Sequence, residues 1–281
     1  MSNREKRVEI FQDTEKVMKE KKILAAAIIN SINQTKVYVS LEEGRTDVKE
    51  TACAVVVSKD RSFAAAEKYH RLHPEDKIAV LNFASATNPG GGVKAGSSAQ
   101  EEALCRCSTL YPALTTKMVY ESFYKYHKAE KNVLYSDMCI YTPDIVVFKT
   151  DTDEPVLKAE EDWAKVDIIT CAAPNLRPIP YNKMNPGSGE ASKITQKELL
   201  ILLKKRTEQI FNVAAKNNVD ALILGAFGCG AFCNPPEVVA RAFKESLEKY
   251  KYCFKYVEFA VYCKATETIN YDVFNRNFSR C

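Results

Sequence analysis

Apolar and polar positions follow two different periods along this chain, and their order predicts its architecture. Apolar residues recur at helical spacing among many charges over residues 3–33, which predicts helix. Short runs rich in β-branched and aromatic residues predict strands at 37–41, 52–57, 77–84, 137–142, 145–148, 166–171, 220–225 and 256–263. Helical patterns separate most of these runs, at 60–72, 100–110, 118–127, 194–217, 235–250 and 271–278.

This alternation favours an α/β fold with a mixed central sheet that helices cover on both faces. The helical pattern gives way to the alternating one near residues 35 to 50. We therefore expect residues 1–50 to form an N-terminal helical extension packed on the core. Residues 51–281 are expected to form one α/β domain.

Three local signals refine the expected boundaries. Asp60 has the residue type of an N-cap for the helix that His73-Pro74 would stop. Pro143-Asp144 separates two apolar runs and predicts the turn of a strand pair. Asn234, followed by Pro235, is the expected N-cap of the helix over 235–250.

Composition changes this picture little. The 281 residues are 46% apolar and 27% charged, which is ordinary for a globular protein, and no apolar run approaches a membrane span in length. The 40 basic and 36 acidic residues leave a net charge of +4. That excess is too small to indicate a nucleic-acid groove, although a local basic pocket for a phosphorylated ligand stays open.

The ten cysteines are scattered along a chain whose first residues are charged and helical rather than apolar. We therefore expect a reducing, cytoplasmic compartment with free thiols. Cys105 with Cys107, and Cys229 with Cys233, lack a second pair at zinc-site spacing. No His/Asp cluster indicates a metal. No histidine accompanies a serine motif, so a Ser/His/Asp triad has no support.

Candidate chemistry concentrates in residues 82–102, where an apolar run ends in Asn88-Pro89 and three glycines, Gly90, Gly91 and Gly92. Core packing does not explain them, because glycine has no side chain and loses the most conformational entropy on folding. They suit a backbone that turns sharply or lies against a ligand. Gln100-Glu101-Glu102 then begins a helix, and adjacent carboxylates beside such a loop indicate acid/base chemistry or sugar recognition.

These polar residues also have a structural interpretation. Ser98 with Glu101, or Ser97 with Gln100, fits the capping box of a helix N-terminus. Glu102 belongs to neither box, but in the first turn it can complement the helix dipole, a contribution of roughly 0.3–1 kcal/mol. As a general acid it must hold a proton, which the helix N-terminus opposes and burial beside an anionic ligand favours.

A second glycine-containing loop, Gly225 to Glu237, follows one predicted strand and precedes a helix. Such units present backbone amides to phosphate, although a tight turn would also use glycines. The spacing is neither the dinucleotide fingerprint nor a P-loop. Two glycine loops at strand ends fit a crevice at the carboxyl edge of a sheet. Of Phe227 and Phe232, we expect Phe232 to be the exposed one.

Asparagines at strand ends have two interpretations, since they serve turns as well as ligands. For Asn82 and Asn88, close to the glycines, contact with a sugar hydroxyl and a turn are about equally favoured. For Asn175 the turn is favoured.

With both loops considered, the sequence resembles the microbial-type poly(ADP-ribose) glycohydrolases of the macrodomain superfamily. That family's signature is Gly-Gly-Gly followed, after six to eight residues, by Gln-Glu-Glu; here the seven residues Val93 to Ala99 separate the two. The resemblance extends to Asn82-Phe83-Ala84, Ala103 to Arg106, Thr109 to Tyr111 and Gly225 to Phe232. The combination of both halves of the signature makes it specific.

The resemblance implies a three-layer α/β/α macrodomain-like fold that binds terminal ADP-ribose without a metal or cofactor. Glu102 would be the catalytic general acid/base that hydrolyses the terminal ribose–ribose bond, and Glu101 would hold hydroxyls of the distal ribose. The expected substrate-binding residues are Asn82, Asn88, Gly90, Gly91, Gly92, Val93 and Gln100, with Gly228, Cys229, Gly230, Ala231 and Phe232 around the diphosphate.

Other functions stay open. The chain could remove single ADP-ribose units from proteins or nucleic acid, or it could bind ADP-ribose as a reader without cutting it. A sugar-nucleotide-binding regulatory domain is a more distant possibility. The presence of both Glu101 and Glu102 argues against a reader. The expected partner is ADP-ribose, poly(ADP-ribose) or an ADP-ribosylated macromolecule, and no membrane partner is expected.

Overall fold

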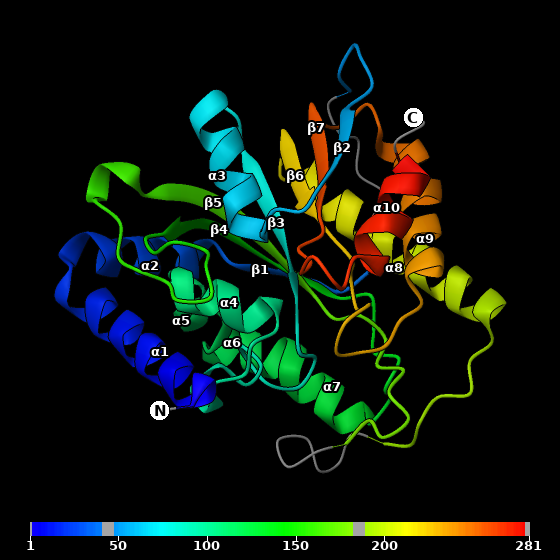
Figure 1. Cartoon of the computed structure of the whole chain (residues 1–281), viewed down its shortest axis with the longest axis horizontal. Coiled ribbons are helices and arrows are strands. Elements are labelled where there is room, and N and C mark those ends of the chain that lie inside the picture. Colours follow the sequence, from blue (N-terminus) through cyan, green and yellow to red (C-terminus); the bar gives the residue numbers. More distant parts are fainter. Residues whose placement is uncertain (1, 41–47, 182–188, 279–281) are drawn as a thin grey trace.

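A computed structural model of the chain describes residues 2–40, 48–181 and 189–278. Within them, a seven-stranded mixed sheet has the order β1-β4-β5-β3-β6-β7-β2 (Figure 1). Its strands are β1 (Lys36–Tyr38), β2 (Ala54–Ser58), β3 (Ile78–Phe83), β4 (Cys139–Val147), β5 (Ala164–Cys171), β6 (Ala221–Leu224) and β7 (Tyr256–Ala260). β4 is antiparallel to β1 and β5, and the other pairs are parallel. The expected mixed sheet is confirmed.

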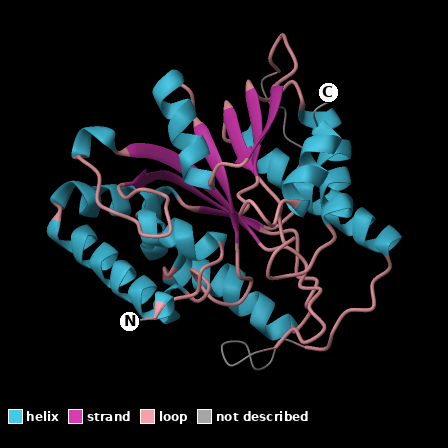
Figure 2. Ribbon diagram, in the orientation of Figure 1, coloured by secondary structure: helices cyan, strands magenta, loops and turns pink. Residues whose placement is uncertain are grey.

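Helices lie on both faces of the sheet (Figure 2). They are α1 (Asn3–Glu20), α2 (Lys22–Gln34), α3 (Ser62–Leu72), α4 (Gln100–Cys107), α5 (Leu110–Leu114), α6 (Lys117–Val119), α7 (Lys125–Glu130), α8 (Gln196–Lys216), α9 (Pro236–Tyr250) and α10 (Ile269–Phe278). One hydrophobic core joins the sheet to α8, α9 and α10, and a second joins its other face to helices that include α3, α4 and α5. The expected α/β/α layering is therefore confirmed.

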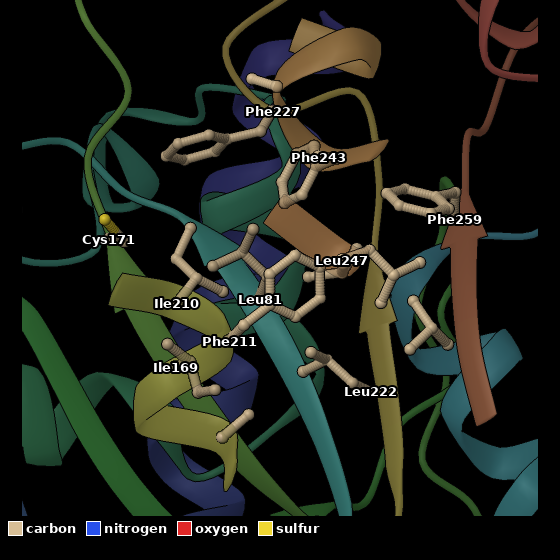
Figure 3. Packing of buried hydrophobic residues seen from close by; sticks show 14 of the residues in the cluster. Leu81, Ile169, Cys171, Ile210, Phe211, Leu222, Phe227, Phe243, Leu247 and Phe259 are labelled. Carbon is tan, nitrogen blue, oxygen red and sulfur yellow. The ribbon is translucent and has the colours of Figure 1, made fainter. Parts of the chain in front are cut away.

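The strands divide their side chains between the two cores with a period of two. Leu81 of β3 packs in the core that contains Phe211 of α8 and Phe243 of α9 (Figure 3). Val80, its neighbour in β3, packs on the opposite face with Ile168 of β5. Each such buried side chain stabilises the fold by about 1.5–3 kcal/mol relative to exposure. Burial on both faces explains why the strands are nearly continuous apolar runs.

The N-terminal helices pack against the sheet through a smaller core. Val17 of α1 and Leu24 of α2 cluster there with Val146 and Phe148, at the end of β4. β1 follows α2 and adds an edge strand beside β4. The division of the chain at residue 50 stays a prediction about how the polypeptide is organised.

The expected strand pair around Pro143-Asp144 is wrong. Both halves belong to the single strand β4, which pairs with β5 on either side of a register shift between Thr142 and Ile145. A bulge accommodates proline, which cannot donate to the ladder. Asp144 has a φ of 56°, and its N–H bonds Asp167 Oδ1 at 3.0 Å.

Two expected N-caps are also wrong. α3 begins after Arg61, and Asp151, distant in sequence, accepts the Phe63 N–H at 3.0 Å, so Asp60 is not needed there. α9 begins after Pro235. The side chain of Asn234 is instead turned inward, where it serves the preceding loop.

Candidate active site

The site begins where two neighbouring strands of the sheet separate. β3 pairs with β5 as far as Phe83, but with β6 only from Ile78 to Val80. Beyond that point the side chain of Gln100 replaces the missing strand. Its Nε2 donates to Leu81 O at 2.8 Å, and its Oε1 accepts from the Phe83 N–H at 2.9 Å. Gln100 thereby fixes the start of α4 against the end of β3, and its contact with substrate stays a prediction.

The first turn of α4 is not capped by a side chain. Its N-cap is Ala99, in an extended conformation, so neither of the two capping boxes that fit the sequence is formed. Glu101 points inward instead and is only 2% exposed. Its Oε2 accepts the Ser85 N–H at 2.7 Å, and its Oε1 lies 3.4 Å from Asn82 Nδ2. Donors at the end of β3 and in the loop after it therefore satisfy this carboxylate.

Glu102 is held differently from its neighbour. It is 7% exposed, and its Oε1 accepts the Gly92 N–H at 2.8 Å. Its Oε2 has no hydrogen-bond partner among the described residues, although the atom is buried. Glu102 also lines the main cavity. A buried carboxylate oxygen without a partner is costly in a protein interior, so this atom is available to a ligand.

The triple glycine makes room for these carboxylates. A Cβ on Gly91 would lie 2.4 Å from Glu102 Oε1 and 3.1 Å from Glu101 Oε2, and Gly91 has a φ of +58°. A Cβ on Gly90 would lie 2.6 Å from the Tyr111 ring. The loop therefore needs glycine at position 91 both for its backbone conformation and for the space that Glu102 fills.

The two acids share one electrostatic environment. Burial, followed by the neighbouring Glu102 carboxylate, raises the pKa of Glu101 well above its ordinary value, while its bonds from Ser85, Asn82 and Gly90 oppose that rise. Two adjacent carboxylates resist ionising together. The Glu101 carboxyl is consequently disposed to keep its proton above the pH at which an ordinary glutamate loses it, so a proton is held next to Glu102, where a general acid is needed.

Both glycine loops face a cavity of about 1050 Å³, large enough for a nucleotide-sized ligand. Predicted site residues that line it are Asn88, Gly91, Gly92, Gln100, Glu101, Glu102, Gly228, Gly230, Ala231 and Phe232. Four predicted site residues do not line the cavity: Asn82, Gly90, Val93 and Cys229. Asn82 and Val93 are buried within the fold, where they support the loop rather than reach the cavity.

The side-chain amide of Asn234 supports the second glycine loop through hydrogen bonds. Its Nδ2 donates to Pro174 O at 2.7 Å and to Gly228 O at 3.2 Å. Gly228 has a φ of +74°, and a Cβ there would lie 2.6 Å from that amide. Gly230, by contrast, is exposed, and a Cβ added to it would meet none of the described residues within 4 Å. This loop offers open backbone toward the cavity.

Phenylalanines of the second loop lie where the sequence predicted. Phe227 is fully buried under the loop, whereas Phe232 is partly exposed and lines the cavity. Arg177 lies over the Phe232 ring at 5.7 Å from its centroid. Asn175 accepts from Arg177 Nε at 3.0 Å and is 1% exposed, in keeping with the predicted turn role.

Sequence reasoning missed several residues of the cavity wall. Arg177 lines it from a Pro- and Asn-rich loop that carries no recognisable motif. Arg7 reaches it from α1, far away in sequence. Arg106 also lines it, and its position four residues after Glu102 on one helix was a usable signal, because such side chains are neighbours.

The remaining sequence-based predictions concern the cysteines, the histidines, a metal site and the membrane. The nine described cysteines are free thiols. Burial lowers the pKa of His127 to about 4, and its ring bonds Phe123 O and Ser136 Oγ outside the cavity. In the described residues no group of three His, Cys, Asp or Glu side chains is placed to hold a metal ion. No helix of the described chain has the length and apolar character to cross a membrane.

A mixed sheet between two helical layers, with two glycine loops closing on a cavity at its carboxyl edge, defines a macrodomain-like fold with paired carboxylates in the ligand cavity. A family model of the catalytic domain of microbial-type poly(ADP-ribose) glycohydrolase (PARG) matches residues 5–150. The chain belongs to this family. The second glycine loop lies beyond the matched residues, so its place in the cavity wall is an independent observation.

Solved structures agree with this assignment. PARG from Thermomonospora curvata is 27% identical, with a TM-score of 0.81 over 98% of this chain and 100% of that one. The same enzyme bound to the inhibitor ADP-HPD gives 28% identity and a TM-score of 0.79, with the same coverage. PARG from Deinococcus radiodurans in complex with ADP-ribose is 31% identical, with a TM-score of 0.72 over 90% of this chain and 97% of that one. No curated protein matches the sequence.

Proposed function

We propose that this protein is a poly(ADP-ribose) glycohydrolase that hydrolyses the terminal ribose–ribose O-glycosidic bond and releases ADP-ribose. The observation that carries the proposal is Glu102, whose Oε1 is fixed by the Gly92 N–H while its Oε2 has no partner among the described residues at the cavity. Membership of the microbial-type PARG family and the ADP-ribose and ADP-HPD complexes of its relatives support it. A cytoplasmic location rests on the sequence alone.

In the proposed reaction, the distal ribose lies against Gly91 and Gly92. Glu102 donates a proton to the leaving oxygen while an oxocarbenium-like ribose forms, and its carboxylate then activates water. The raised pKa of Glu101 favours a proton on that carboxyl beside Glu102, and Glu101 holds hydroxyls of the same ribose. The diphosphate lies on the backbone of residues 228–232, where its charge stabilises the cation.

The test is Glu102→Gln, which keeps the shape of the side chain but removes its acid/base function. With poly(ADP-ribose) as substrate, we expect ADP-ribose release to fall by about 10²–10⁴-fold, while the dissociation constant for ADP-ribose measured by calorimetry stays within about threefold. Glu121→Gln, on an exposed residue outside the cavity, is the matched control. Turnover near that of the wild type would refute the assignment of Glu102.

The same assay separates the alternative functions. A mono-ADP-ribosylated protein is offered in parallel with the polymer, and the products are resolved by chromatography. Release from the polymer supports the proposal, release from the modified protein alone makes the enzyme a mono-ADP-ribosyl hydrolase, and binding without release from either makes it a reader.

A further inference from the structure

Three consecutive backbone carbonyls in the segment between the triple glycine and Glu101 each accept a hydrogen bond from a different arginine. Arg4 Nε donates to Ala95 O at 2.6 Å, and Arg7 Nε donates to Gly96 O at 2.7 Å. Arg106 Nη1 donates to Ser97 O at 2.7 Å. Two of these arginines come from α1 and one from α4, so they approach the same short segment from two different helices.

The clamped segment closes back on Gly92. Residues Val93–Ala95 form one 3-10 turn, and Gly96 ends it with a φ of +73°. The carbonyl of Gly92 accepts the N–H groups of Ala95 at 2.9 Å and of Ser97 at 3.1 Å. Two of the residues whose carbonyls the arginines hold therefore also donate their amides to Gly92.

Gly92 in turn positions the acid. Its own N–H is the donor to Glu102 Oε1 at 2.8 Å, which leaves Oε2 without a partner among the described residues. An unbroken series of hydrogen bonds therefore runs from the arginine side chains through the turn to the Glu102 carboxylate. A shift of the turn would move the Gly92 N–H and change the direction of that carboxylate.

α1 is anchored firmly enough to act as a fixed support. Phe11 is 1% exposed and meets the Tyr111 ring edge-on, with centroids 5.1 Å apart. Thr14 Oγ1 donates to Arg106 O at 2.7 Å, and Lys149 Nζ lies 2.6 Å from Asp13 Oδ2. A Cβ on Gly96 would lie 2.3 Å from Arg4 O, so the turn and the helix are in close backbone contact.

We propose that α1 is a functional part of the active site, and that Arg4 and Arg7 are positioning residues that orient the Glu102 carboxylate through the turn at residues 93–97. Arg106 completes the clamp from α4. The inference rests on the proposed function, since it assigns Glu102 the catalytic role. Arg4 and Arg7 bond protein carbonyls through Nε, and in this role they need not touch the substrate.

The test compares Arg7→Ala, Arg7→Gln and the double variant Arg4→Ala/Arg7→Ala with the wild type, using poly(ADP-ribose). We expect the double variant to lose about 10- to 100-fold in kcat, because small misplacements of a catalytic group have effects of this size. KM and the dissociation constant for ADP-ribose should stay within about twofold. Arg7→Gln keeps a hydrogen-bond donor without the charge and should recover part of the loss seen in Arg7→Ala.

Lys16→Ala is the matched control, because Lys16 is an exposed cation on the same helix and pairs only weakly with Glu20, at 3.9 Å. It should leave kcat unchanged. Hydrogen exchange gives a second readout that needs no turnover. In the double variant, the peptide over residues 90–99 should exchange faster, while the peptide over β5 should exchange as in the wild type.

The proposal would be overturned if the variants had a higher KM than the wild type at unchanged kcat, and if added salt abolished that difference. Such a result would mean that the arginines attract the anionic substrate. Unchanged kcat with faster exchange at residues 90–99 would also overturn it. If the double variant does not fold, the single variants Arg7→Gln and Arg7→Ala test the proposal by the same comparison of the change in kcat with the change in KM. Failure of the proposed function itself shows separately, as full activity in Glu102→Gln.

Discussion

The two glycine loops at the carboxyl edge of the sheet differ in what occupies the space that their glycines leave. In the loop after β3, Glu102 and Glu101 fill the space beside Gly91. In the loop after β6, the space beside Gly230 is open, and the neutral amide of Asn234 holds Gly228. The first loop uses glycine to bring charge close to the backbone, and the second uses it to leave the backbone accessible.

This difference separates two tasks of one cavity. Burial and the adjacent Glu102 carboxylate raise the pKa of Glu101 in the first loop's site, which suits proton transfer in bond cleavage. Exposed backbone amides before a helix suit an anionic diphosphate and need no side-chain chemistry. Substitutions that displace the first loop should therefore impair turnover, and substitutions that displace the second should impair binding.

The largest effect is expected from Gly91→Ala. The new Cβ would be placed 2.4 Å from Glu102 Oε1, at a residue whose φ is +58°. We expect kcat to fall by about 100-fold or more, because the carboxylate must move away from its position in the cavity. Steady-state kinetics with poly(ADP-ribose) and calorimetry with ADP-ribose measure the two properties separately. Near-normal kcat would show that the carboxylate position seen here is not the catalytic one.

An intermediate effect is expected from Gly228→Ala, with Gly230→Ala as its matched control in the same loop. A Cβ on Gly228 would lie 2.5 Å from Ala173 Cβ at a φ of +74°, whereas Gly230 has room for one. We expect Gly228→Ala to weaken ADP-ribose binding by about tenfold, a loss near 1.4 kcal/mol, and Gly230→Ala to change it by less than threefold. Equal effects of the two substitutions would contradict the distinction between a supported and an open position.

The two loops also show which parts of the site could be predicted from the sequence and which could not. The glycines and the Gln-Glu-Glu triplet are local patterns, so their placement at strand ends and their convergence on one cavity were predictable. The arginine clamp was not, because Arg4 and Arg7 meet carbonyls about 90 residues further along the chain. The bonds of Gln100 to β3 were not predictable either, because the early separation of β3 from β6, which leaves Leu81 and Phe83 to bond its side chain, is a property of the sheet.

The smallest expected effect is the change in thermal stability caused by Glu101→Gln. It also distinguishes the two loops, because the buried acids lie beside the first loop only. Burial and Glu102 raise the folded-state pKa of Glu101 above its unfolded value. Such a group stabilises the fold below the unfolded pKa, and that contribution is lost as pH rises through the folded-state pKa. The neutral Glu101→Gln avoids this loss. Its amide can also donate to Asn82 Oδ1, which is buried and has no partner among the described residues.

We therefore expect the melting temperature of Glu101→Gln, relative to the wild type, to rise as the pH increases from 4.5 to 8. For a protein of this size the gain is about 2–4 °C for each kcal/mol recovered. Thermal denaturation of both proteins at several pH values is the measurement, and Gly230→Ala should show no such pH dependence because it adds no titratable group. A difference that stays constant with pH would mean that Glu101 is ionised in the folded protein throughout, which would contradict its raised pKa.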